Sequence, residues 1–186
     1  MTAVTAPSVD SYLHPPPGGW MADDLDRFPD DGLRYELVDG VLRVSSAPSE
    51  QHQIVLGNLH VQLVAECPGH LRVLLAPFDV RLSPRRQLQP DLIALPKDRA
   101  APDRTPLLVV EVASPSTRLT DQTLKRRVFE HAGVPSYWLV DPLEPALTIL
   151  ELRDGTYVQV AGVEGDEPVT LQLPFPVSLV PSTLLL

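Results

Sequence analysis

The sequence predicts an α/β fold in which a mixed central β-sheet is flanked by helices. Short apolar runs rich in β-branched residues recur along the chain, and residues 107–113 are a clear example. Alternating segments are joined by Asp-Gly pairs at 39–40 and 154–155, which is typical of hairpins with type I′ turns. Two further segments, 49–66 and 121–132, carry apolar residues at helical spacing. This order of strands and helices is typical of a mixed α/β sheet.

Length and composition indicate one domain preceded by an arm. The chain has 186 residues, enough for one domain with a substantial core. Residues 1–19 end in three prolines and two glycines and are expected to form a flexible N-terminal arm. Residues 20–186 are then expected to form a single domain.

Charge and cysteine content narrow the class of protein. The net charge is −9, which argues against a protein that coats DNA but not against an enzyme whose cleft carries metal cations. Cys67 is the only cysteine, so a disulfide or a multi-thiolate zinc site within one chain is excluded. The sequence shows neither the start of a signal peptide nor the roughly 18 consecutive apolar residues of a membrane span. A cytoplasmic protein without a membrane segment is therefore expected.

The elements alternate between strands and helices along the whole chain. Ser49 is the expected N-cap of the first long helix, and Gly133 the expected C-terminal stop of the second. The predicted helices are residues 20–28, 49–66 and 121–132. The predicted strands are residues 33–38, 41–45, 72–76, 78–82, 92–95, 107–113, 137–140, 147–152 and 157–161, with a final edge strand at 169–173.

Glu111 lies inside a strand that reads as covered on both faces. A carboxylate there costs several kcal/mol, on the order of the penalty for burying an unpaired charge, unless a cation compensates it. The period of two places Val109, Glu111 and Ala113 on one face. Two explanations remain open at this point: a buried Arg or Lys paired with Glu111, or a metal ion held by it.

Asp91 is the second acidic candidate. It opens one apolar strand after Pro90, and Glu111 sits in the next predicted strand. Adjacent strands would bring both carboxylates within reach of one hard cation such as Mg²⁺, which binds phosphate oxygens and activates water. The alternative is that Asp91 only forms a turn.

Two further polar residues lie on the predicted helices. Lys125 follows Asp121 by four residues, so an exposed ion pair between them is the simple alternative to a role in the sheet. An ammonium near an attacking water could orient it or stabilise charge at phosphorus. His52 lies in a first helical turn, where a histidine is more often solvated than a ligand, although it could approach the site from its helix.

The combined pattern resembles the Uma-two (Uma2) family of putative restriction endonucleases, within the PD-(D/E)XK nuclease superfamily. The resemblance covers residues 20–152 and rests on several short motifs. These are Tyr-Glu36-Leu-Val-Asp-Gly, Gln-Pro-Asp91, Val-Val-Glu111-Val-Ala-Ser-Pro-Ser-Thr, Asp121…Lys125 and Gly133-Val-Pro-Ser-Tyr-Trp-Leu-Val-Asp-Pro.

The resemblance implies a restriction-endonuclease-like core and a Mg²⁺ site, with Mn²⁺ as a possible substitute. Asp91 and Glu111 would bind the metal, together with the backbone carbonyl of Val112, and Glu36 would be an auxiliary acid. The superfamily lysine expected two positions after Glu111 is replaced by Ala113, and Lys125 is the candidate replacement. The implied activity is metal-dependent hydrolysis of phosphodiester bonds in nucleic acid, with DNA as the expected partner and a homodimer suited to cutting two strands.

Two rival functions stay open. A catalytically inactive interaction module on the nuclease fold would agree with Ala113 and with the acidic charge. A small-molecule phosphodiesterase would share the metal chemistry but would need a closed pocket.

Overall fold

The computed structural model describes residues 14–98, 105–114 and 121–185 of the chain. Its contacts divide the chain into two compact units. Unit 1 runs to Ala47 and resumes over Asp79–Gln89, and unit 2 comprises Pro48–Phe78 and Pro90–Leu186. The expected arm over 1–19 and the expected single domain over 20–186 stay predictions.

Unit 1 is built on a four-stranded antiparallel sheet in the order β2-β1-β5-β4. Its elements are α1 Ala22–Leu25, β1 Arg34–Val38, β2 Val41–Ser45, β4 Val80–Ser83 and β5 Arg86–Leu88. The hairpin of β1 and β2 was predicted, and Asp39 and Gly40 have the positive φ values of 52° and 82° that its turn requires. The helix expected over 20–28 is shorter and spans only Ala22–Leu25.

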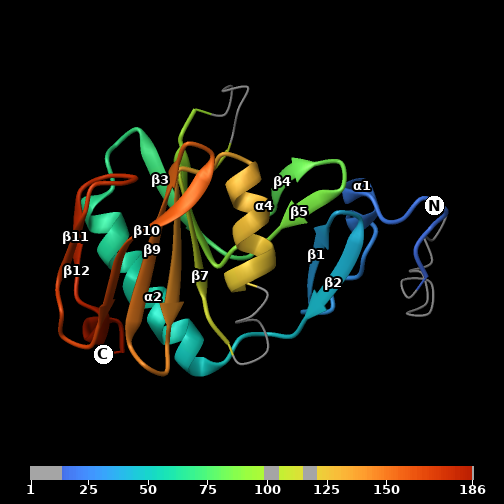
Figure 1. Ribbon diagram of the computed structural model, residues 1–186. Helices are drawn as coiled ribbons and strands as arrows, with labels where there is room; N and C mark the ends of the chain where they lie inside the picture. Colours follow the sequence, from blue (N-terminus) through green and yellow to red (C-terminus); the bar gives the residue numbers. More distant parts are fainter. Residues whose placement is uncertain (1–13, 99–104, 115–120, 186) are drawn as a thin grey trace. The chain divides into compact units, whose positions relative to one another are not determined.

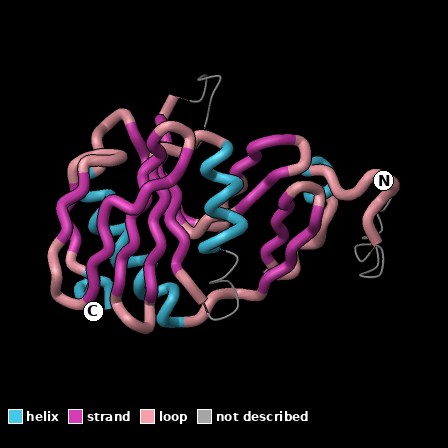
Figure 2. Tube along the Cα trace, viewed as in Figure 1, coloured by secondary structure: helices cyan, strands magenta, loops and turns pink. Residues whose placement is uncertain are grey.

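Unit 2 contains a six-stranded sheet in the order β10-β9-β8-β7-β6-β3. Neighbours β7 and β8 run parallel, and every other neighbouring pair is antiparallel. The strands are β3 Leu71–Leu75, β6 Leu92–Pro96, β7 Leu108–Val112, β8 Ser136–Asp141, β9 Ala146–Arg153 and β10 Thr156–Glu164. The sheet and its helices appear in Figure 1, and Figure 2 shows how strongly strands predominate. The predicted mixed α/β fold is confirmed.

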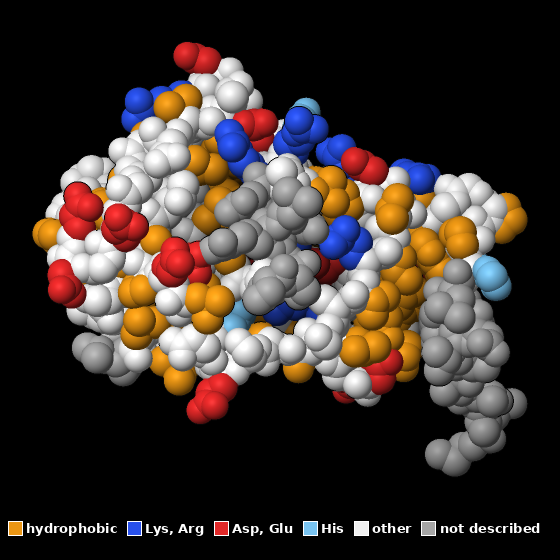
Figure 3. Space-filling view, turned by 60° about the horizontal axis from the view of Figure 1, so that its bottom comes forward, with side chains coloured by type: hydrophobic (Ala, Val, Ile, Leu, Met, Phe, Trp, Pro, Cys, Tyr) orange, Lys and Arg blue, Asp and Glu red, His pale blue; other side chains and the backbone are white. Residues whose placement is uncertain are grey.

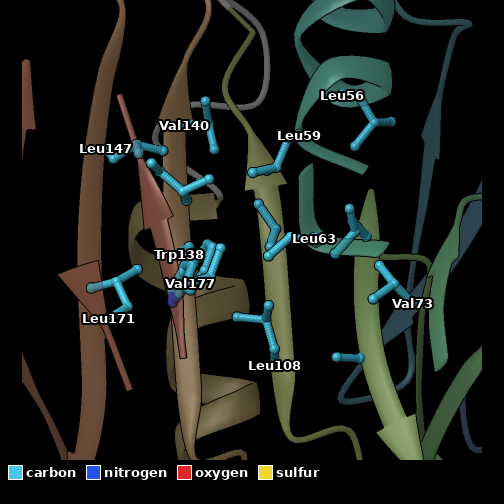
Figure 4. Packing of buried hydrophobic residues seen from close by; sticks show 14 of the residues in the cluster. Leu56, Leu59, Leu63, Val73, Leu108, Trp138, Val140, Leu147, Leu171 and Val177 are labelled. Atoms are coloured by element: carbon cyan, nitrogen blue, oxygen red, sulfur yellow. The ribbon is translucent and has the colours of Figure 1, made fainter. Parts of the chain in front are cut away.

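Helix α2 (Glu50–Glu66) packs on one face of this sheet. Its apolar stripe includes Leu56, Leu59 and Leu63, which point toward the strands in Figure 4. The stripe meets the alternate positions Val110 and Val112 of β7 in one buried cluster. The predicted helix over 49–66 is thus confirmed, with Ser49 as its N-cap.

Helix α4 (Arg126–His131) packs on the opposite face. The ring of Phe129 lies 5.9 Å from that of Tyr137 in β8, and the neighbouring β8 position Trp138 belongs to the cluster with α2. Successive residues of a strand point to opposite faces, so α4 and α2 cover different sides. Glu111 alternates with Val110 and Val112 and therefore faces α4.

The second helix and the end of the chain differ from the predictions. Over 121–132 the chain forms a π-helical turn, η2 Asp121–Lys125, followed by α4, and Gly133 with φ 78° ends it as expected. The segment predicted as an edge strand, 169–173, is instead β11 Val169–Leu171, which pairs with β12 Val177–Leu179 in a separate two-stranded sheet. A 3₁₀ segment, η3 Pro181–Leu185, contacts α2. None of the helices in the described part of the chain is both long and apolar enough to cross a bilayer.

Candidate active site

The sheet register of unit 2 brings Asp91 and Glu111 to adjacent positions. Strands β6 and β7 are hydrogen-bonded neighbours, with Leu92 opposite Val110. Asp91 comes directly before β6, and extending this register by one residue places its backbone opposite Glu111. Both residues are buried, with 2% and 1% of their surface exposed. The expectation that the strand opened by Asp91 and the strand of Glu111 are neighbours is confirmed, and a metal shared by the two carboxylates stays a prediction.

Asp91 is held by donors from two elements. Its Oδ2 accepts a hydrogen bond from the backbone N–H of Val112 at 2.8 Å and lies 3.1 Å from Nε2 of His52. A buried carboxylate that bridges β7 and α2 is not the turn-forming aspartate considered as the alternative. The contact of Val112 with Asp91 is made through its N–H, and metal binding by its carbonyl stays a prediction.

Glu111 forms a buried ion pair with Lys125. The amine Nζ lies 3.2 Å from both carboxylate oxygens, and Lys125 is only 3% exposed. The pair resolves one of the open explanations for the strand glutamate, since a lysine does compensate its charge. Because Lys125 is buried, the alternative of an exposed ion pair between Lys125 and Asp121 is excluded.

Hydrogen bonds to Tyr157 of β10 fix the helix that follows Lys125. Its backbone N–H donates to Oε1 of Glu130 at 2.6 Å, and its carbonyl accepts from the Arg126 guanidinium at 3.2 Å. The phenol donates to the carbonyl of Val134 at 2.9 Å. Burial, followed by the negative charge of Glu130, raises the pKa of Tyr157, so the phenol keeps its proton for this bond. Helix α4 is therefore tied to β10 through Arg126 and Glu130.

His52 is the site residue that sequence reasoning undervalued. It was expected to be solvated, yet it is 5% exposed and contacts Asp91. The sequence did contain an indication that His52 is buried. His52 precedes Val55, Leu59 and Leu63 at helical spacing and therefore extends the buried stripe of α2. Its backbone N–H donates to the cap Ser49 at 3.3 Å, which places it in the first turn as predicted.

Glu36 lies in β1 of unit 1 and is 5% exposed. Its Oε1 accepts the backbone N–H of Gln89 at 2.9 Å. The guanidinium of Arg34 donates to the backbone carbonyl of Gln89 at 3.2 Å, and the side-chain amide of Gln89 donates to Asp79 at 2.9 Å. Three residues of unit 1 thus hold Gln89, two residues before Asp91 in the chain. An auxiliary role of Glu36 beside a metal stays a prediction.

Two other polar residues make contacts that a structural role explains. Arg81 forms an ion pair with Asp23 at 2.7 Å. Asp141 accepts hydrogen bonds from the backbone N–H groups of Leu143 and Glu144, as a turn-forming aspartate does. Residues 115–117 of the Ser-Pro-Ser-Thr motif lie outside the described residues.

The acidic pair suits a hard divalent cation. Over residues 14–98, 105–114 and 121–185, no cluster of three or more His, Cys, Asp or Glu side chains is arranged to hold a metal ion. Mg²⁺ commonly takes only one or two protein carboxylates and completes its shell with water and substrate phosphates. The donor chemistry of Asp91 and Glu111 fits that requirement.

The mixed sheet defines the class of this protein as restriction-endonuclease-like. Residues 22–184 match the Uma2 family, described as "Putative restriction endonuclease", and the chain belongs to that family. Its structure is similar to the crystal structure of a putative nuclease belonging to DUF820 from Anabaena variabilis, with a TM-score of 0.70 at 16% sequence identity. The similarity covers 89% of this chain and 97% of the other. No curated protein matches this chain.

Proposed function

We propose that this protein is a metal-dependent endonuclease that hydrolyses phosphodiester bonds of nucleic acid, with DNA as its substrate. The observation that carries the proposal is the presence of two buried acids, Asp91 directly before β6 and Glu111 in the neighbouring strand β7, with the amine of Lys125 on the second acid. Membership of the Uma2 family supports it.

Asp91 and Glu111 would hold Mg²⁺ or Mn²⁺, with the carbonyl of Val112 as a further ligand. When bound, such an ion lowers the pKa of water and neutralises charge on a phosphodiester. The N–H of Val112 and the imidazole of His52 keep the Asp91 carboxylate in one orientation. Glu36 would assist as an auxiliary acid.

Lys125 takes the place of the lysine that is absent at Ala113. Residues 111 and 113 share one face of β7, and the Lys125 amine lies against Glu111 on that face. Its ammonium can therefore serve the region that a lysine at position 113 would serve. There it would orient the attacking water and stabilise the negative charge that develops at phosphorus.

One observation favours a second function, an inactive interaction module on the same fold. Lys125 already compensates Glu111 through both oxygens, so this carboxylate has a partner without any metal. The net charge of −9 also opposes binding to a phosphate backbone, and Figure 3 shows acidic side chains exposed beside basic ones on one face.

A cleavage panel separates the two functions. Plasmid, single-stranded and structured DNA and RNA are incubated with Mg²⁺, Mn²⁺ or a chelator, using wild type and the near-isosteric D91N. We expect cleavage of DNA by the wild type with metal and none by D91N or with the chelator. Calorimetric titration with both ions, and sedimentation to test for a homodimer, complete the test. Absence of both metal binding and cleavage would establish the interaction module instead.

A further inference from the structure

His52 contacts a proposed metal ligand although no motif of the sequence assigns it a role. We propose that His52 is a positioning residue that fixes the Asp91 carboxylate for metal binding. The proposal rests on the metal-dependent function proposed above and adds to it a residue from α2.

The hydrogen-bond chemistry of the pair sets the tautomer of the ring. The two atoms Nε2 and Asp91 Oδ2 are 3.1 Å apart, and both side chains are buried. An ionised carboxylate only accepts hydrogen bonds, so Nε2 must carry the hydrogen. The N–H of Val112 donates to the same oxygen at 2.8 Å. Donors from α2 and β7 therefore converge on Oδ2 and restrict rotation of the carboxylate.

The other ring nitrogen shows that His52 is not there for packing alone. Nδ1 is buried and has no hydrogen-bond partner among the described residues. A buried polar atom without a partner costs free energy, whereas an apolar side chain would extend the stripe of α2 without that cost. The imidazole at this position is better explained by what Nε2 does for Asp91.

A metal-binding side chain binds the ion more tightly when a neighbouring residue, itself not in contact with the ion, hydrogen-bonds to it and fixes its orientation. Removal of such a partner commonly weakens metal affinity by about 10- to 100-fold. His52 can have this effect without touching the ion, because the two donors hold Oδ2 in place before any cation arrives. Asp91 then needs little reorganisation when it binds.

Two amide variants of the full-length chain test the inference. In H52Q the amide nitrogen can reach the position of Nε2 and restore the bond to Asp91, whereas in H52N the amide nitrogen lies near the position of Nδ1. We expect H52N to raise the Kd for Mn²⁺, measured by calorimetry, by about 10- to 100-fold. We expect H52Q to remain within about threefold of wild type, because its donor is retained. Thermal unfolding checks that both variants fold, and H52L replaces H52N if the latter does not.

Ring ¹⁵N NMR of the metal-free wild type provides a readout that does not depend on activity. We expect a hydrogen on Nε2 and loss of its hydrogen-bond signature in D91A. A metal affinity of H52N or H52L equal to that of wild type overturns the inference while the proposed function stands. The inference is also overturned, while the proposed function stands, if the wild type cuts DNA only with metal but carries the ring hydrogen on Nδ1 alone. If the wild type binds neither Mg²⁺ nor Mn²⁺, the proposed function fails, and the positioning role fails with it.

Discussion

Two buried glutamates, one in each unit, occupy strands and make different kinds of contact with the rest of the chain. Glu111 in β7 meets the ammonium of Lys125 through both oxygens, at 3.2 Å each. Glu36 in β1 accepts the backbone N–H of Gln89 at 2.9 Å. The first contact joins opposite charges, and the second satisfies a peptide group that carries none.

The difference teaches that a strand glutamate alone does not reveal its role. A buried ion pair becomes costly when either partner is removed, because the remaining charge stays buried. A carboxylate that accepts a peptide N–H holds a backbone segment, and a neutral acceptor can do the same. The predictions below are arranged to test whether this contrast determines stability and activity.

Removal of Glu111 should have the largest effect. E111A leaves the Lys125 ammonium buried without its carboxylate, so the free energy of unfolding should fall by about 3–5 kcal/mol. Cleavage should fall below detection, because one proposed metal ligand is lost. Urea denaturation and the plasmid assay measure the two effects. A stability equal to that of wild type would contradict the ion pair.

Removal of both partners should separate stability from activity. E111L/K125M replaces the pair by apolar side chains of similar size, and such replacements are often neutral or stabilising. The double variant should therefore recover most of the stability lost in E111A, while cleavage stays absent. The double-mutant cycle, with E111L and K125M as its single variants, gives the coupling free energy. A cycle with no coupling would mean that the two groups do not interact in solution.

Loss of Lys125 alone should move rate and metal affinity in opposite directions. K125M removes the proposed stabiliser of charge at phosphorus, and loss of one such donor costs about 10²- to 10³-fold in turnover. Glu111 then lacks its ammonium, so a divalent cation should bind at least as tightly as in wild type. Single-turnover kinetics and calorimetry provide the two numbers. Unchanged turnover would remove Lys125 from the proposed chemistry.

Substitution of Glu36 should have a smaller effect that depends on what replaces it. E36A leaves the Gln89 N–H without its acceptor and should lower the free energy of unfolding by about 1–3 kcal/mol. E36Q keeps an acceptor oxygen for the Gln89 N–H and should be more stable than E36A. If Glu36 assists the metal, E36Q should still lose about 10-fold or more in cleavage. Wild-type cleavage by E36Q would show that Glu36 does not assist the metal.

The smallest effect is expected for an exposed ion pair of unit 2. Arg153 lies 3.1 Å from Glu151, and its side chain is largely exposed. R153A should change the free energy of unfolding by less than about 1 kcal/mol, because solvent and salt screen such pairs. Cleavage should be unchanged. This variant is the matched reference for the buried pair.

The sequence predicted those parts of the fold that depend on local chemistry. Three features depend only on interactions between residues close together in the sequence. They are the Asp-Gly turns, the Ser49 cap and the apolar stripe of α2. Strand β5 escaped prediction because its three residues, Arg86–Leu88, are too few to show an alternating pattern. The pairing of β11 with β12 depends on a partner strand that local periodicity does not identify.

For the candidate site, the sequence indicated a buried acid and left its partner open between a basic side chain and a metal ion. Burial of Glu111 followed from the apolar strand around it, and the neighbouring positions of β6 and β7 agree with the expected order of strands. The position of the Lys125 amine depends on how η2 and α4 pack, which short-range patterns do not specify. His52 was misjudged because its place in the first turn was given more weight than its place on the apolar stripe.

Whether the amine of Lys125 points toward Glu111 depends on the rotational position of Lys125 around the helix axis, because Lys125 is the last residue of the turn η2. A π turn closes i→i+5 bonds and so accommodates one residue more than an α turn. Lys125 directly precedes α4, whose Arg126 and Glu130 are bonded to Tyr157, so inserting one residue between Lys125 and Arg126 would rotate the lysine by about 100° relative to α4, away from its carboxylate. Length changes before Lys125 leave this phase intact, whereas a single insertion after it does not. Homologous chains can thus be sorted by where their gaps fall.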